Sequence, residues 1–143
     1  NVKTGMPVVT DKGIAGIVYS VSDNYSIART LNNVDLSLTV KCERTRENAV
    51  MKWIGDRLVM INVPKTYGLK KGDRVVTSEI SSIVPVPIPV GVVAEIGNLE
   101  MGIFNEVTIK PFVDFQKVEN VFVLGLVKDK EIDDIQFNFL NKR

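Results

Sequence analysis

The sequence predicts an all-β protein made of two small barrel or sandwich domains that are related by an internal repeat. A glycine followed by a β-branched run at 5–10 recurs at 72–77, and each copy continues to a second glycine with branched apolar residues, at 16–18 and 91–93. This order is typical of a strand–turn–strand unit. Almost no segment has the 3.6-residue apolar period of an amphipathic helix. Two copies are too few for a solenoid, so we expect a pair of β modules.

The two copies differ in the length of the turn between their strands. The step from Thr10 to Gly16 is six residues, whereas the step from Thr77 to Gly91 is fourteen. The eight extra residues fall around the proline-rich run 84–89. The alternative interpretation is a chance similarity between two valine-rich strands.

Two segments after the first copy alternate apolar and polar residues, which is the period of a half-buried strand. They are 25–31 and 36–42. Cys42 falls in the apolar register of the second, so we expect a small buried hydrophobe there. The apolar face of the first carries Tyr25, Ile27 and Leu31.

A hairpin is expected next, because the apolar runs 50–54 and 58–63 flank the turn residues 55–57. Pro64 closes the second strand of this hairpin, since proline cannot donate to a ladder. The short turn that follows leads into the second copy.

The last part of the chain predicts two more strands and a tail. Segment 104–110 alternates, and 118–127 is nearly all apolar, as in a strand covered on both faces. Segment 128–134 has mixed charge and is either a short helix or a loose tail. We therefore predict a first β domain over 1–66, which can accept a late strand from the second half. A second β domain follows over 67–127, and a C-terminal tail over 128–143.

The composition argues against catalysis. The 143 residues contain no histidine, which excludes Ser-His-Asp and Cys-His triads and the usual zinc sites. Cys42 is the single cysteine, so an intrachain disulfide cannot form. No P-loop, GxGxxG, HExxH or GxSxG pattern occurs. The sequence predicts a protein that is not an enzyme and binds no cofactor or metal ion.

Charge and hydropathy restrict the partners further. The net charge of +1 and the 7% of aromatic residues give no reason to expect nucleic acid as a partner. No segment reaches the roughly 18 apolar residues of a membrane helix, and no signal peptide is visible. We expect a soluble fragment whose targeting or anchoring segment lies elsewhere in the full-length protein.

The proline run and the tail are the candidate partner-binding surfaces. Prolines at alternate positions of 84–89 hold the backbone near polyproline II, with apolar residues between them. The run is either a connection that covers the core or a preordered ridge for a partner. Large apolar residues at 137–140 should not remain in water. The candidate partner-binding residues are Val84, Val86, Ile88, Phe137, Phe139 and Leu140.

Structural glycines and prolines recur along the chain, in segments 5–18, 63–64, 72–78, 83–85 and 88–93. Together these segments resemble the family of the bacterial rod-shape-determining protein MreC. The resemblance spans residues 5–124, and its motifs name no active site. Segments 50–55 and 113–115 are similar to the Bacteroidetes-type version of the family.

This resemblance implies a non-enzymatic periplasmic scaffold of the cell-elongation machinery, which controls cell shape. It implies anchoring to the inner membrane by a segment absent from this fragment. It also implies self-association, as a homodimer or higher, and contact with the class B penicillin-binding transpeptidase, MreD and RodA, in a complex linked to MreB. The residues alone predict only a duplicated β interaction module. A small-ligand or oligosaccharide-binding β-barrel is the alternative function, and it requires polar and aromatic residues that converge in a groove.

Overall fold

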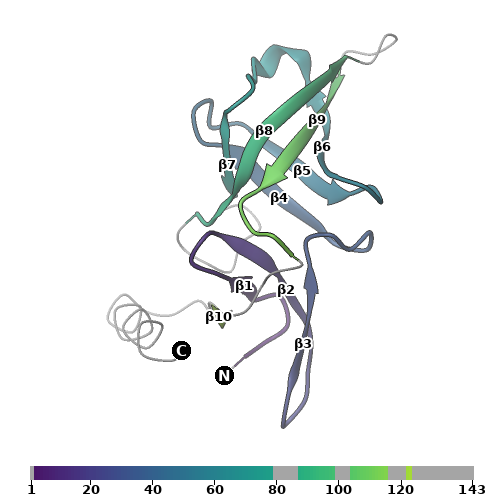
Figure 1. Cartoon of the computed structure of the whole chain (residues 1–143), viewed down its shortest axis with the longest axis vertical. Helices are drawn as coiled ribbons and strands as arrows, with labels where there is room; N and C mark the ends of the chain where they lie inside the picture. The colour runs from purple at the N-terminus through teal and green to yellow at the C-terminus, as the bar shows by residue number, and fades with distance from the viewer. Residues whose placement is uncertain (1, 79–86, 99–103, 116–121, 124–143) are drawn as a thin grey trace.

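The computed structural model of the chain describes residues 2–78, 87–98, 104–115 and 122–123 (Figure 1). Ten strands and one short 3₁₀ helix account for the regular structure of these residues, which confirms the predicted all-β class. In chain order the elements are β1 (Pro7–Val9), β2 (Ile14–Val21), β3 (Ser26–Thr30), β4 (Ser37–Cys42), β5 (Asn48–Trp53), β6 (Leu58–Pro64), η1 (Lys65–Tyr67), β7 (Arg74–Thr77), β8 (Pro89–Asn98), β9 (Phe104–Pro111) and β10 (Phe122–Val123).

These strands form two units. One is a four-stranded antiparallel sheet in the order β10-β1-β2-β3, and the other is a closed six-stranded barrel in the order β4-β5-β6-β9-β8-β7. Figure 1 shows the sheet below the barrel, with the β2–β3 hairpin projecting away from it. One hydrophobic cluster joins the two units, because Val9 and Ile14 of the sheet, with Leu31 directly after β3, belong to the same buried group as the barrel interior.

The predicted boundary between residues 66 and 67 falls inside the barrel, and this is a correction to the predicted domain limits. Strands β4 to β6 precede it and β7 to β9 follow it, yet β4 pairs with β7 and β6 pairs with β9. Closure removes the free edges that either set of three strands would expose alone. The sheet takes a strand from late in the chain, since Val8 of β1 pairs with Val123 of β10. The predicted tail 128–143 lies outside the described residues.

The internal repeat is confirmed, residue by residue, by the backbone pairing of its two copies. The amide of Gly5 donates to the carbonyl of Val18 at 2.8 Å, and the amide of Gly72 donates to the carbonyl of Val93 at the same distance. In both copies the register between the first two strands shifts between the two consecutive valines, between 8 and 9 and between 75 and 76.

The repeat includes a third strand that the sequence comparison did not detect. Val18 of β2 pairs with Ala28 of β3, and its equivalent, Val93 of β8, pairs with Ile109 of β9. A second register shift follows each of these valines, between 18 and 20 and between 93 and 95. The meander β1-β2-β3 is therefore a structural copy of β7-β8-β9, closed into a barrel only in the second copy.

The second glycine of each copy is required by a close approach between backbones. A Cβ atom added to Gly16 would lie 2.1 Å from the carbonyl oxygen of Arg29, and one added to Gly91 would lie 2.2 Å from that of Lys110. Real Cβ atoms do not tolerate such distances. The two copies also meet each other, since a Cβ at Gly13 would lie 2.4 Å from the carbonyl oxygen of Pro89.

Candidate interaction surfaces

The structure corrects the prediction that Ile88 lies on an exposed ridge. Its side chain is 5% exposed and belongs to the buried cluster. Its amide donates to Thr77 Oγ1 at 2.8 Å, and its carbonyl accepts from the amide of Thr77 at 2.9 Å. Pro89 follows as the first residue of β8, the position where a strand tolerates proline. This end of the proline run is therefore a core-covering connection, the other of the two interpretations.

The remaining predicted partner-binding residues lie outside the described residues. They are Val84, Val86, Phe137, Phe139 and Leu140.

The described residues carry a different apolar surface, on the projecting β2–β3 hairpin. Tyr25 is 63% exposed and Ile27 is 40% exposed, whereas Leu31, predicted to share their covered face, is buried. Because β1 ends the pairing with β2 near Ile17, the distal half of the hairpin has no third strand beside it among the described residues. The exposed large hydrophobic residues of this hairpin are Tyr19, Val21, Tyr25 and Ile27.

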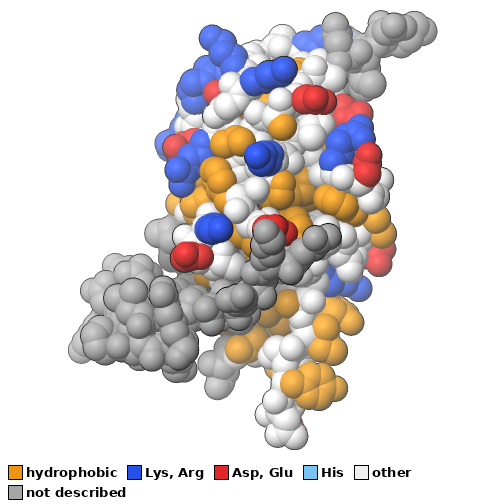
Figure 2. Space-filling view, in the orientation of Figure 1, with side chains coloured by type: hydrophobic (Ala, Val, Ile, Leu, Met, Phe, Trp, Pro, Cys, Tyr) orange, Lys and Arg blue, Asp and Glu red, His pale blue; other side chains and the backbone are white. Residues whose placement is uncertain are grey.

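Charges of both signs lie on the face of the barrel that Figure 2 shows. Figure 2 shows Lys and Arg side chains interspersed with Asp and Glu over the visible face of the barrel, and apolar side chains on the hairpin below it. An open hollow of about 270 Å³ lies on the barrel. No aromatic side chain of the described residues lines it, so these residues do not supply the platform that an oligosaccharide site needs. Its lining residues are Arg57, Lys71, Glu95, Ile96, Gly97, Glu106 and Thr108.

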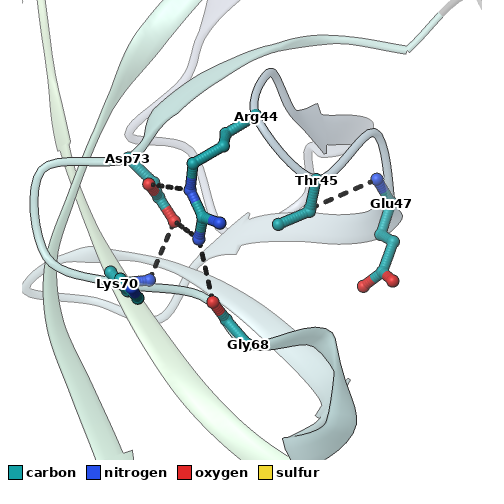
Figure 3. A network of polar contacts seen from close by, with 6 residues as sticks. All are labelled: Arg44, Thr45, Glu47, Gly68, Lys70 and Asp73. Carbon is teal, nitrogen blue, oxygen red and sulfur yellow. Dashed lines mark hydrogen bonds and ion pairs between the residues drawn. The ribbon is translucent and has the colours of Figure 1, made fainter.

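A polar cluster around Arg44 and Asp73 ties two connections of the barrel together (Figure 3). The Arg44 guanidinium donates to both carboxylate oxygens of Asp73, at 2.9 and 2.8 Å, and to the carbonyl of Gly68 at 2.8 Å. The amide of Lys70 donates to Asp73 at 2.8 Å. The Asp73 side chain is only 9% exposed. The Arg44 hydrogen bonds lower the pKa of Asp73 from 3.8 to about 2. The cluster is a structural clamp on the turn that opens the second repeat.

This clamp predicts a pH dependence of stability. A carboxylate whose pKa is lower in the folded state stabilises the fold above its unfolded pKa of 3.8 and loses that contribution as the pH falls through about 2. We expect the free energy of unfolding of Asp73→Asn to lie below that of the wild type at pH 6, with the difference shrinking between pH 4 and pH 2. Urea unfolding at several pH values measures this. Asp56→Asn, at a 72% exposed carboxylate paired with Arg57, is the control and should track the wild type.

The described residues contain no recognisable metal site, exposed thiol or membrane-spanning helix. Among them no group of three or more cysteine, aspartate or glutamate side chains could hold a metal ion. Cys42 is fully buried, as its register predicted. No helix among the described residues is long and apolar enough to cross a membrane.

Comparisons with known proteins agree with this architecture. A family model described as "Rod shape-determining protein MreC, barrel core" matches residues 1–125. The chain is 30% identical over 122 residues to the cell shape-determining protein MreC of Haemophilus influenzae, covering 84% of this chain and 35% of that protein. It is 28% identical over 129 residues to MreC of Listeria monocytogenes, covering 86% and 44%. The chain thus spans less than half the length of these curated relatives.

Solved structures show the same fold. The crystal structure of MreC from Pseudomonas aeruginosa superposes with a TM-score of 0.78 at 26% identity, covering 86% of this chain and 81% of that one. Two structures with lower identity share the fold. One is a complex between penicillin-binding protein PBP2 and MreC from Helicobacter pylori, with a TM-score of 0.73 at 15% identity, covering 90% and 83%. The other is the major periplasmic domain of the cell shape-determining filament MreC, with a TM-score of 0.71 at 24% identity, covering 87% and 79%.

The family match extends from the first repeat, through the closed barrel, to β10. The match includes both copies of the meander, β1-β2-β3 and β7-β8-β9. This chain therefore belongs to the rod shape-determining protein MreC family, and residues 1–125 correspond to the barrel core of that family.

Proposed function

We propose that this chain is a periplasmic scaffold of the bacterial cell-elongation machinery, which helps to control cell shape by self-association and by binding a class B penicillin-binding transpeptidase. The observation that carries the proposal is the barrel-core match over 1–125. Periplasmic placement is supported by the similar fold of a periplasmic domain of MreC. Binding of the transpeptidase is supported by the complex of the Helicobacter pylori MreC with PBP2.

A scaffold role also fits the way this chain uses its residues. Its motif glycines, Gly16 and Gly91, allow neighbouring backbones to approach closely, and the charged cluster of Arg44 and Asp73 clamps a turn. Without histidine, the chain lacks the most common general base near neutral pH. We propose that the protein acts without catalysing a reaction, through surfaces that it presents to its partners.

The wider assembly is part of the same proposal. In it, the full-length protein is anchored to the inner membrane and contacts MreD and RodA, in a complex linked to MreB. The short motifs at 50–55 and 113–115 support a Bacteroidetes-like version of the family. Co-purification of the full-length protein from envelope membranes, with MreD, RodA and MreB detected by mass spectrometry, tests these contacts.

Binding of the transpeptidase is the direct test. With the chain immobilised, we expect saturable binding of the periplasmic part of the class B transpeptidase from the same bacterium, measured by biolayer interferometry. A class A penicillin-binding protein at the same concentrations is the control and should not bind. Calorimetry with muropeptides should show no heat of binding. Binding of muropeptides without binding of the transpeptidase would favour the oligosaccharide-binding alternative and contradict the scaffold.

A further inference from the structure

The two copies of the meander differ at the outer edge of their third strand. In the second copy this edge is completed, since β6 pairs with β9 and places Leu58 opposite Ile109 and Met60 opposite Val107. In the first copy the equivalent strand, β3, is the last strand of its sheet. No strand among the described residues pairs with its outer edge. The closed copy thus shows what the open copy lacks, an antiparallel strand beside β3.

The direction of the backbone groups on β3 follows from its bonds to β2. The amide of Leu31 donates to Ala15 at 2.9 Å, and the carbonyl of Tyr25 accepts from Ser22 at 2.8 Å. Residues two apart on a strand point their amides and carbonyls the same way. The odd-numbered residues of β3 therefore face β2, and the even-numbered residues direct their N–H and C=O groups outward. These outward residues are Ser26, Ala28 and Thr30.

Exposed apolar side chains gather around this edge. Half of the exposed large hydrophobic residues in the described part of the chain, four of eight, lie between positions 19 and 27. The Arg29 guanidinium lies 4.3 Å from the centre of the Tyr19 ring. Ile27 shares the face of Arg29, because residues two apart on a strand share a face. The strand contains no proline or lysine, two residues that commonly protect free edges, and its one charged residue, Arg29, lies over the Tyr19 ring.

We propose that β3 pairs antiparallel with β3 of a second copy of this chain, about a two-fold axis through Ala28. The inference rests on the self-association in the proposed function and assigns it a surface. Ala28 would lie opposite Ala28 of the second copy, and Ser26 opposite Thr30. These three opposed pairs would exchange about six main-chain hydrogen bonds. The two four-stranded sheets would become one continuous sheet of eight.

The strand favours a second copy because it is complementary to itself in this register. The residue on the axis is small, so the backbones can approach. Arg29 would lie opposite Ile27 of the second copy, so no like charges are directly opposed. Ile27 would in turn lie beside the Tyr19–Arg29 pair of the second copy, which buries apolar surface on both sides of the axis. The net charge of +1 adds little repulsion between copies.

Disulfide trapping tests the register. The Cα atoms of a directly opposed hydrogen-bonded pair lie about 5.5 Å apart, within the range of a disulfide. Mild oxidation of Ala28→Cys should therefore give a covalent dimer. Ser26→Cys alone and Thr30→Cys alone should not, but a mixture of the two should give a heterodimer. The native Cys42 is fully buried, so we expect it to contribute little to disulfide formation between copies. Ile54→Cys, on the 40% exposed Ile54 of the barrel, is the control and should form no covalent dimer on the same oxidation.

Sedimentation equilibrium tests the strength of the contact. Ile27→Lys should raise the dissociation constant of the dimer by at least about tenfold, since each copy loses apolar burial at the axis. Ile54→Lys is matched to it, because both isoleucines are 40% exposed, and should leave the constant unchanged. If the wild type associates but neither Ile27→Lys nor Ala28→Cys behaves as expected, the β3–β3 contact is refuted. Self-association through another surface is then retained. A strictly monomeric wild type overturns both the β3–β3 contact and self-association. Binding of the transpeptidase is tested separately, by interferometry.

Discussion

Replacement of Gly91 by alanine is expected to lower the free energy of unfolding by about 3 kcal/mol or more. The new Cβ would lie 2.2 Å from the carbonyl oxygen of Lys110, and the nearest atoms belong to the backbone of β9 rather than to a flexible side chain. Relief requires β8 and β9 to separate inside a closed barrel, where each strand is held on both edges. Urea unfolding followed by tryptophan fluorescence measures the loss, with Trp53 as the single reporter in β5.

Two further glycine variants test whether this effect comes from the repeat. Gly16→Ala should also destabilise strongly, because its Cβ would lie 2.1 Å from the carbonyl oxygen of Arg29. Gly97→Ala, on the same strand as Gly91, is the control. Its Cβ would lie 3.2 Å from the carbonyl of Glu106, so a small shift suffices and a loss below about 1 kcal/mol is expected. Equal losses at Gly91 and Gly97 would contradict the assigned close approach.

The repeat was predictable because its residues are under backbone constraint. Only glycine fits where Gly16 and Gly91 approach the next strand, so both copies have glycine at the equivalent position of the meander. The third strands have no such constraint. Ala28 and Ile109 occupy equivalent positions, but one lies on an open edge and the other is buried in the barrel. Their side chains follow these surroundings, so the sequences differ and the similarity ends at the second strand.

The domain boundary was not predictable from local pattern. Strands β4 to β6 have the alternation that any half-buried strand has. This pattern does not identify the strands with which they pair. That choice depends on long-range closure, since β4 and β7 meet only when the barrel forms. The exposure of Tyr25 and Ile27 was missed for a related reason. Their alternation predicts a covered face, but both residues lie on the distal half of the β2–β3 hairpin, beyond the part of β2 that pairs with β1, and their side chains are exposed.

The proline run permitted two interpretations because its apolar residues suit either a core or a partner. The decisive contact involves the distant Thr77, whose side chain and backbone both bond to Ile88. A sequence pattern contains no information on that pairing. Only the fold shows that Ile88 is covered.

Replacement of Ile88 by lysine is therefore expected to unfold or severely destabilise the protein, by about 3 kcal/mol or more, because it places an unpaired charge in the buried cluster. An exposed ridge would instead tolerate the charge and lose only partner binding. Thermal unfolding by circular dichroism distinguishes the two. Ile54→Lys, at a 40% exposed isoleucine, introduces the same charge on the barrel surface and should change stability by less than about 0.5 kcal/mol. A stable Ile88→Lys protein that no longer binds its partner would support the interpretation as an exposed ridge and contradict the buried position of Ile88.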